Sequence, residues 1–402
     1  MHALREAVAE FQGLYGPFTI AERVLQKIWL RQDFDCHAAR LADGRSLEVV
    51  SPGAWNLLGG PDFRAAQLKI GGREIAGDVE VHFRVSDWKA HAHASNPNYA
   101  SVALHVVLFP PEPHEKPATN GADHAEIPLL ALLPLLHRSL EEYAADDALE
   151  TLTSRDEWTR FAELGTMSPS ELDLVLRRQA EVRWQQKVRF AQMRIEKLGW
   201  TAAAHQTALE ILGYRHNRPA MLALAARYPL EQWTKFEPDI LCEENRGRWQ
   251  LHGVRPANHP RTRLRQYCAW ARHCPNWPER WTELARDIPI SPFAAAPTRE
   301  AREQFDLPKL REKLSNDFTV DSIPSTRFET LMCDGLLPLA AAHERRDLFP
   351  AWFHWYPGDL PDQIRRALVK LGTAGTKSQP LCHGFGQGLL GWLLAHEVNA
   401  SR

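Results

Sequence analysis

Apolar residues in the first third of the chain fall in short runs separated by turn residues, which is the pattern of β-strands. Two such runs flank the pair Gly71-Gly72 within residues 59–84 (GGPDFRAAQLKIGGREIAGDVEVHFR), and this arrangement predicts a β-hairpin. The run at residues 47–50 predicts a short strand before the hairpin. Residues 101–109 (SVALHVVLF) are almost entirely apolar and predict a central strand that is buried on both faces.

Helical spacing appears on both sides of the hairpin. In residues 20–30 (IAERVLQKIWL) apolar side chains recur every three or four positions, which predicts a helix. After the hairpin, Ser86 and Asp87 can cap a second, short helix. The predicted order is therefore helix, strand, hairpin, helix, strand. Two prolines in residues 126–136 argue against a central strand, so we expect this run to form an edge of the sheet.

From about residue 155 the spacing of apolar residues is helical almost throughout. It opens with residues 168–198, where Ser168 is placed to cap a helix that carries Pro169 and Glu171 in its first turn. We therefore expect an α/β domain over residues 1–145 and an all-α domain over residues 155–402.

Net charge, cysteine content and the length of apolar runs indicate the compartment of the protein but not its activity. The 402 residues carry a formal net charge of −2, so no global basic field points to nucleic acid. Six scattered cysteines without a CxxC pair favour free thiols in a reducing compartment. The first ten residues do not resemble a signal peptide, and no apolar run reaches the ~20 residues of a membrane helix. We expect a cytoplasmic protein with no membrane partner.

Three polar residues mark the predicted hairpin. Asp62 stands at the mouth of its first strand, behind a Gly-Gly-Pro turn, and Glu80 and His82 lie on the return strand. Glu80 and His82 share one face of that strand, because side chains alternate between faces with a period of two. The hairpin therefore gathers two carboxylates and an imidazole, provided that Asp62 points to the same face.

The register of an unbroken hairpin does not satisfy this condition. A two-residue loop places Asp62 opposite Val81, on the face away from Glu80. One extra residue on the return strand corrects the mismatch, and Gly77 is the natural place for it. We therefore predict a β-bulge, or a turn longer than two residues, within residues 71–78.

The pair Pro61-Asp62, followed by Glu80-Val81-His82, resembles the motif of PD-(D/E)XK nucleases, with histidine in the position of the lysine. The resemblance implies a restriction-endonuclease-like mixed sheet with the element order αβββαβ. It also implies a divalent cation, Mg²⁺ or Mn²⁺, held by Asp62, Glu80 and the carbonyl of Val81. In this hypothesis His82 positions or deprotonates the attacking water.

Other residues are candidates for supporting roles. Glu22, near the start of the first helix, and Glu48, on the short strand, are candidate auxiliary acids for the metal. For Glu22 the alternative is a carboxylate that stabilises the helix N-terminus. His91 and His93 are candidate phosphate contacts or ordinary surface residues.

The histidines also allow a different metal site. Three of His82, His91, His93 and His105 can make a zinc centre, although no His-Glu-x-x-His motif is present. His91 and His93, two residues apart, diverge on a helix but share a face on an extended segment. For His105 the alternative is a hydrogen-bonded residue of the core.

An arginine-rich stretch lies in the predicted helical domain. Residues 246–272 mix arginines with aromatic residues, and Arg255, Arg261 and Arg263 within them are candidate contacts to a phosphate backbone. The alternative is a set of surface arginines and inter-helix ion pairs. A homo-oligomer or a protein partner that binds through the helical domain is a further hypothesis.

Longer stretches of the chain resemble an uncharacterised bacterial family, DUF family 2851. They are SPGAWNLLGGPDF, GDVEVHFRVSDWKAHAH, NYASVALHVV, VRPANHPRTRLRQ and CDGLLPLA. We expect a metal-dependent nuclease that acts on DNA or RNA. Two alternatives remain open: a nuclease-like protein that binds nucleic acid or acts as a scaffold without cutting, and a metallohydrolase whose ion is held by histidines.

Overall fold

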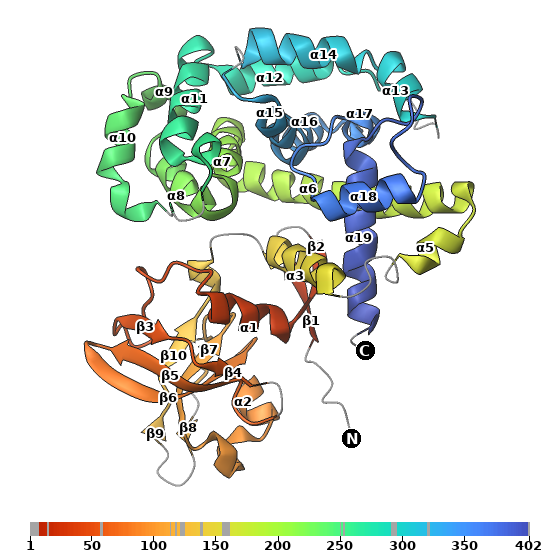
Figure 1. The fold of residues 1–402 in the computed structure, drawn as a ribbon. Helices are drawn as coiled ribbons and strands as arrows, with labels where there is room; N and C mark the ends of the chain where they lie inside the picture. Colours follow the sequence, from red (N-terminus) through yellow and green to blue (C-terminus); the bar gives the residue numbers. More distant parts are fainter. Residues whose placement is uncertain are drawn as a thin grey trace. The chain divides into compact units, whose positions relative to one another are not determined.

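The computed structural model divides the chain into two compact units (Figure 1). The α/β unit comprises Met1–Glu10, Thr19–Asp147 and Val398–Arg402, and the helical unit comprises Phe11–Phe18 and Ala148–Glu397. The structure describes residues 8–13, 16–56, 59–112, 114–116, 119–120, 125–136, 140–154, 161–249, 251, 254–290, 296–319 and 322–400.

A mixed six-stranded sheet forms the centre of the α/β unit. Its order is β10-β7-β6-β5-β3, with β4 beside β5. The pairs β3–β5 and β5–β6 are antiparallel, and β6–β7 and β7–β10 are parallel. The strands are β3 (Leu47–Ser51), β4 (Ala54–Trp55), β5 (Phe63–Ile70), β6 (Arg73–His82), β7 (Val102–Val107) and β10 (Leu129–Ala131). Two small two-stranded sheets are formed by β1 (Val8–Gly13) with β2 (Gly16–Ala21), and by β8 (Thr119–Asn120) with β9 (Ala125–Glu126).

The predicted order of helices and strands is confirmed. Helix α1 (Glu22–Arg31) precedes the sheet and packs against β6. Between β6 and β7 the chain forms a short helix, α2 (Asp87–Ala90), and two 3₁₀ turns, η1 (His93–Ser95) and η2 (Pro97–Tyr99). Strand β7 is central and β10 lies at the edge, as predicted. The 3₁₀ turn η3 (Leu133–Leu135) follows β10.

The predicted position of the bulge is wrong. Gly71-Gly72 form a two-residue turn, since Ile70 pairs with Arg73, and the return strand has no extra residue before Gly77. The register instead shifts on the first strand, between Phe63 and Ala66, where Ala65 has a left-handed φ of 56°. Phe63 therefore pairs with Val79, and Asp62 precedes it directly opposite Glu80.

Gly77 has a different role from the predicted bulge. A Cβ atom on Gly77 would lie 2.5 Å from the Ala103 Cβ and 2.9 Å from the Ser101 carbonyl oxygen. The missing side chain allows β6 and β7 to approach each other. The sheet then presents an apolar face that includes Phe63, Val79 and Val81, all fully buried. Its other face carries Asp62, Glu80 and His82, because side chains alternate along each strand.

In the described residues from Ala148 onward, the helical unit consists mainly of helices, as the spacing predicts. The α-helices that follow β10, of which α3 crosses the boundary between the units, are α3 (Leu140–Ser154), α5 (Ala162–Thr166), α6 (Pro169–Leu198), α7 (Trp200–Leu212), α8 (Tyr214–Arg227), α9 (Leu230–Trp233), α10 (Pro238–Glu244), α11 (Pro260–His273), α12 (Trp277–Arg286), α13 (Thr298–Gln304), α14 (Leu307–Lys313), α15 (Ser325–Leu331), α16 (Leu337–Glu344), α17 (Phe349–His354), α18 (Asp362–Lys370) and α19 (His383–Ala400). The shorter turns are the 3₁₀ turns η4 (Arg246–Arg248) and η5 (Pro256–Asn258) and the π-helical turns η6 (Leu314–Phe318) and η7 (Met332–Leu336).

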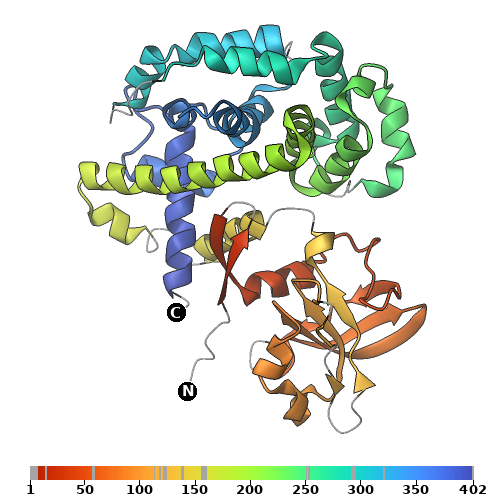
Figure 2. The ribbon, with the colours of Figure 1, turned by 180° about the vertical axis from the view of Figure 1, so that it is seen from behind.

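Local sequence signals account for two features of this unit. Ser168 and Glu171 form the predicted capping box at the start of α6. The glycine-rich segment before Leu389 lets α19 cross α6 closely, because a Cβ on Gly388 would lie 2.2 Å from the Leu176 carbonyl oxygen (Figure 2). Among the described residues, no helix is long and apolar enough to cross a membrane.

Candidate metal centre

The bulge in β5 joins Asp62 and Glu80 through two reciprocal hydrogen bonds. The Val81 N–H donates to Oδ2 of Asp62 at 2.9 Å, and the Asp62 N–H donates to Oε2 of Glu80 at 3.0 Å. Each carboxylate is therefore held by the backbone beside the other. The other Glu80 oxygen, Oε1, faces the histidines described below.

Helix α1 supplies a second support for Asp62. The Gln26 Nε2 donates to Oδ1 of Asp62 at 2.8 Å, and the Gln26 Oε1 accepts a hydrogen bond from Trp55 Nε1 at 3.1 Å. Glu22 stands one helical turn before Gln26, on the same face of α1. Burial raises the pKa of Tyr99, and the charges of Glu80, Asp62 and Glu22 raise it further. The charge of Glu22 therefore acts on the same surroundings as those of Glu80 and Asp62.

Burial changes the protonation of both carboxyls. It raises the pKa of Asp62, with the charge of Glu80 as the second cause, and it raises the pKa of Glu80 to about 8. Glu80 is only 5% exposed. Two buried carboxyls side by side disfavour ionisation, so at neutral pH the pair retains a proton unless a cation replaces it.

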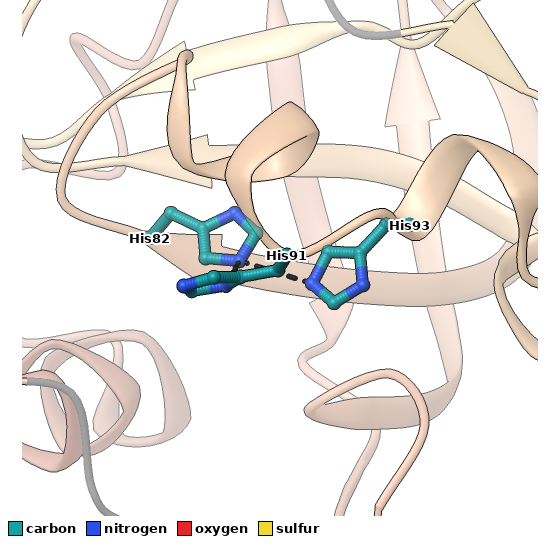
Figure 3. Close-up of side chains that lie close together, drawn as sticks. All are labelled: His82, His91 and His93. Atoms are coloured by element: carbon teal, nitrogen blue, oxygen red, sulfur yellow. Dashed lines mark hydrogen bonds between the residues drawn. The ribbon is translucent and has the colours of Figure 1, made fainter.

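The imidazoles of His82, His91 and His93 converge on one point (Figure 3), and Glu80 contacts two of them. The Nε2 atom of His82 lies 3.1 Å from Nδ1 of His91 and 3.3 Å from Nε2 of His93. The Glu80 Oε1 lies 3.4 Å from the His82 Nε2 and 3.1 Å from the His93 Nε2. The other nitrogen of His82, Nδ1, lies 2.9 Å from Nε2 of His105.

A turn of the backbone brings His91 and His93 together. Helix α2 ends at Ala90, and Ala92 adopts a left-handed conformation with a φ of 57°. The left-handed residue interrupts the helical path between the two histidines, so their side chains do not diverge as they would on a continuous helix. A non-glycine residue in this conformation stores strain, and such strain gathers at functional sites.

The histidines are neutral and only one of them is exposed. His82 is 1% exposed, His93 is buried and His91 is accessible to solvent. Burial lowers the pKa of His82, and the charges of His105, His91 and His93 lower it further. Burial also lowers the pKa of His93 to about 4 and that of His105 to about 3. Neutral imidazoles offer lone pairs to a cation, but His82 cannot supply the permanent positive charge of a lysine.

The structure separates Glu48 from the other acids. Glu48 on β3 is the cross-strand partner of Lys69 on β5. Lys69 follows Asp62 by seven residues, which separates the two positions by roughly 20 Å at the rise of a strand. It is exposed, and its carboxylate contacts the Lys69 ammonium at 3.5 Å. The candidate role of Glu48 as a metal ligand is therefore not supported by its position. Val81 is adjacent to the site and contributes its backbone N–H to Asp62.

Arg255, Arg261 and Arg263 belong to the helical unit. Arg255 is exposed, and Arg261 lies within 4 Å of carboxylate oxygens of Asp239 and Glu243. Arg263 is 3% exposed and donates to Asn258 and Gln266. Only Arg255 and Arg261 are placed on a surface that a phosphate backbone can reach.

The contributions of Gln26, Tyr99 and His105 to the site do not follow from motifs. Gln26 carries a weak signal, since it follows Glu22 by one helical turn. Tyr99 stacks on His93, with ring centroids 3.8 Å apart, and His105 contacts His82 from β7. The sequence names His105 as a possible zinc ligand or core residue, but its contact with His82 and the stacking of Tyr99 on His93 depend on tertiary packing.

The comparisons with known proteins agree with the family resemblance over three of its five stretches, while residues 254–266 and 333–340 lie outside the match. A family model described as a protein of unknown function (DUF2851) matches residues 22–244, which is more than half of the chain. No curated protein and no solved structure matches the chain. The matched segment includes the whole candidate centre, from Glu22 to His105. The chain belongs to the DUF2851 family.

Proposed function

We propose that this protein is a divalent-metal-dependent hydrolase of phosphodiester bonds in nucleic acid. The observation that carries the proposal is the pairing of two buried carboxyls, Asp62 and Glu80, on adjacent strands beside His82. Carboxylates brought together in this way are typical of sites where a cation activates water and stabilises charge on a phosphate.

The topology supports a PD-(D/E)XK-like core as part of this proposal. Strands β3, β5 and β6 form an antiparallel meander after α1, and β7 returns parallel to β6 after α2. Asp62 precedes the second strand of the meander and Glu80 lies near the end of the third. These are the positions that the motif resemblance gives to the two acids.

The residues present fit a divalent cation. The two carboxyls have raised pKa values because they are buried, and the charge of Glu80 raises that of Asp62 further; a bound cation would let both ionise. Glu80 and the neighbouring imidazoles would hold the ion, which supplies an acidified water and stabilises the negative charge of the phosphate. The motif resemblance proposes Mg²⁺ or Mn²⁺ held by Asp62, Glu80 and the Val81 carbonyl, whereas the imidazoles beside Glu80 suit a transition-metal ion.

Side chains of the protein carry out the remaining roles, which are proton transfer and charge balance. Asp62 is held by Gln26 and by the Val81 N–H beside Glu80, and its carboxylate can accept a proton from the attacking water. Both His82 nitrogens face other groups of the cluster, so the role of general base passes from His82 to Asp62 in this proposal. Glu22, on the same face of α1 as Gln26, adds negative charge that favours a cation.

Nuclease assays test the proposal with matched variants. The full chain, stripped of metal, is incubated with single- and double-stranded DNA and RNA in the presence of Mg²⁺, Mn²⁺ or Zn²⁺. We expect cleavage with at least one ion, and a loss of at least about 100-fold in Asp62→Asn. The control is Asp43→Asn, which changes an exposed acid paired with Arg45 on a turn.

Two outcomes contradict the hydrolase. They are absence of cleavage with every ion and substrate, and unchanged cleavage in Asp62→Asn. Binding of nucleic acid without cleavage would support the scaffold alternative. The metallohydrolase with histidine ligands is a second candidate, favoured by the imidazoles that converge on Glu80.

A further inference from the structure

We infer that Glu80, His82, His91 and His93 form a four-coordinate site for a transition-metal ion of the zinc class, with His105 as the residue that orients His82. The inference deepens the proposed function, on which its catalytic meaning rests, by naming the ion class and its ligand atoms. It replaces the oxygen-ligand site for Mg²⁺ that the motif resemblance implies.

The His82 Nε2 lies at the spacing of metal ligands from each of the other three candidate ligand atoms. The Nε2 of His82 lies 3.1 Å from the His91 Nδ1, 3.3 Å from the His93 Nε2 and 3.4 Å from the Glu80 Oε1. The His93 Nε2 and the Glu80 Oε1 lie 3.1 Å apart. Four ligands at the usual zinc–nitrogen and zinc–oxygen distances of about 2.0–2.1 Å are separated from one another by about 3.3 Å. These four distances match the edges of a small four-coordinate site, and the ligand atoms of the three histidines all lie within 4.8 Å of one another.

Hydrogen bonding alone does not satisfy these contacts. The Nε2 of His82 faces three polar atoms, but an imidazole nitrogen carries either one proton or one lone pair. If the His93 Nε2 donates a proton to Glu80, it has none to give to His82. A single cation at the centre satisfies all four atoms together, which explains why buried polar groups crowd at this point.

His105 fixes the orientation of His82 from behind. With a proton assigned to the His82 Nδ1, that nitrogen donates to the His105 Nε2 at 2.9 Å, and the His82 Nε2 keeps its lone pair toward the centre. Glu80 is fixed in the same way, because its Oε2 accepts the Asp62 N–H and its Oε1 remains for the ion. Metal-binding residues are commonly oriented by such second partners.

The donor set selects the class of ion. Three imidazole nitrogens and one carboxylate oxygen suit Zn²⁺, Co²⁺ or a similar transition metal, whereas Mg²⁺ prefers six oxygens. His91 is exposed, so the ion can be loaded from solvent through this residue. The other three members are buried, which favours tight retention.

Metal content and cobalt spectroscopy of the full chain test the site. The protein is stripped with a chelator and titrated with Zn²⁺ and with Co²⁺. We expect one ion per chain to survive dialysis, and a Co²⁺ absorption spectrum with the intense visible bands of four-coordinate geometry. Weak bands of six-coordinate Co²⁺, or less than one tenth of an equivalent of Zn²⁺ retained, would overturn the inference.

Variants separate the ligands from their surroundings. We expect His93→Asn to weaken Zn²⁺ binding at least 100-fold and His105→Gln to weaken it 10–100-fold. His37→Asn, which changes an exposed histidine outside the cluster, is the control. Equal affinity in the wild type and His93→Asn contradicts the site. The wild-type Co²⁺ spectrum does not depend on the folding of any variant.

The two proposals fail in different ways. Tight Zn²⁺ binding without cleavage of any nucleic acid would sink the hydrolase and leave the metal site standing. Cleavage supported by Mg²⁺ in protein that retains no Zn²⁺ would sink the histidine site and leave the hydrolase standing.

Discussion

Ala65 sets the position of Asp62. As the extra residue of the bulge in β5, it allows Asp62 to lie opposite Glu80 instead of opposite Val81. Its φ of 56° is unfavourable for a residue with a Cβ atom, whereas glycine adopts it freely. The Ala65 N–H donates to Oδ1 of Asp78 at 2.9 Å, which holds the bulge in place.

Replacing Ala65 with glycine tests this strain. We expect Ala65→Gly to raise the free energy of unfolding of the α/β unit by about 0.5–1 kcal/mol, because relief of the left-handed strain exceeds the entropy cost of a glycine. We expect Ala65→Val to lower it by about 1–2 kcal/mol. Urea denaturation measures both changes. Ala76→Gly, at an ordinary exposed position of β6, is the control and should destabilise; equal destabilisation by Ala65→Gly contradicts the account.

The sequence indicates some members of the site and misses others for a physical reason. Asp62, Glu80 and His82 are candidates because a short motif spaces them along one hairpin. The position of the bulge cannot be predicted, because one extra residue on either strand restores the parity between Asp62 and Glu80. The support from Gln26 and His105 arises only when α1 and β7 pack against the hairpin.

At the scale of elements, the pairing of β6 with β7 brings the cluster together. Glu80 on β6 pairs with His105 on β7. The spacing of the two strands therefore sets the distance between His105 and His82. Gly77 allows the close approach of the two strands near Ala103. The order of strands follows from their apolar runs, but the 3₁₀ turns that carry His93 and Tyr99 have no such periodicity.

A side chain at position 77 should therefore push the strands apart. We expect Gly77→Ala to lower the free energy of unfolding of the α/β unit by about 1–3 kcal/mol, as overpacking usually does. Urea denaturation followed by circular dichroism measures the change. Ala76→Val adds volume at the neighbouring exposed position and should be nearly neutral. A neutral effect of Gly77→Ala would show that β6 and β7 are not in close contact.

At the scale of the whole molecule, the helical unit depends on buried neutral histidines. His205 lies 2.5 Å from the Tyr267 hydroxyl through Nδ1 and 3.0 Å from the Tyr228 carbonyl oxygen through Nε2. Burial lowers the pKa of His205 to about 4, and that of His354 and His383 to about 3. Each is uncharged in the folded chain at pH values where it is protonated in the unfolded chain.

Lowering the pH should consequently destabilise this unit at pH values above those at which ordinary carboxylates are protonated. The unfolded chain binds more protons below pH 6.5, so stability is full above that pH and falls as pH drops toward 4. Each such histidine contributes a slope of about 1.4 kcal/mol per pH unit within this window. Urea denaturation monitored by tryptophan fluorescence at pH 7.5, 6.0 and 5.0 measures the slope.

Substitution of His205 measures how much this residue contributes to the pH dependence of the free energy of unfolding. We expect His205→Gln to lower stability at pH 7.5 and to reduce the dependence on pH, because the variant has no proton to gain at that position. His273→Gln, on the exposed surface of α11, should leave the slope unchanged. An identical slope in the wild type and His205→Gln would contradict the assignment.

Binding of one metal ion beside Glu80 is the central claim, and its most direct test is anomalous diffraction from crystals of the zinc-loaded protein, measured on both sides of the zinc edge. The account predicts one peak in the α/β unit, about 2.0–2.2 Å from Oε1 of Glu80 and the facing nitrogens of His82, His91 and His93. A peak elsewhere, or zinc-loaded crystals with no peak at this point, would contradict it.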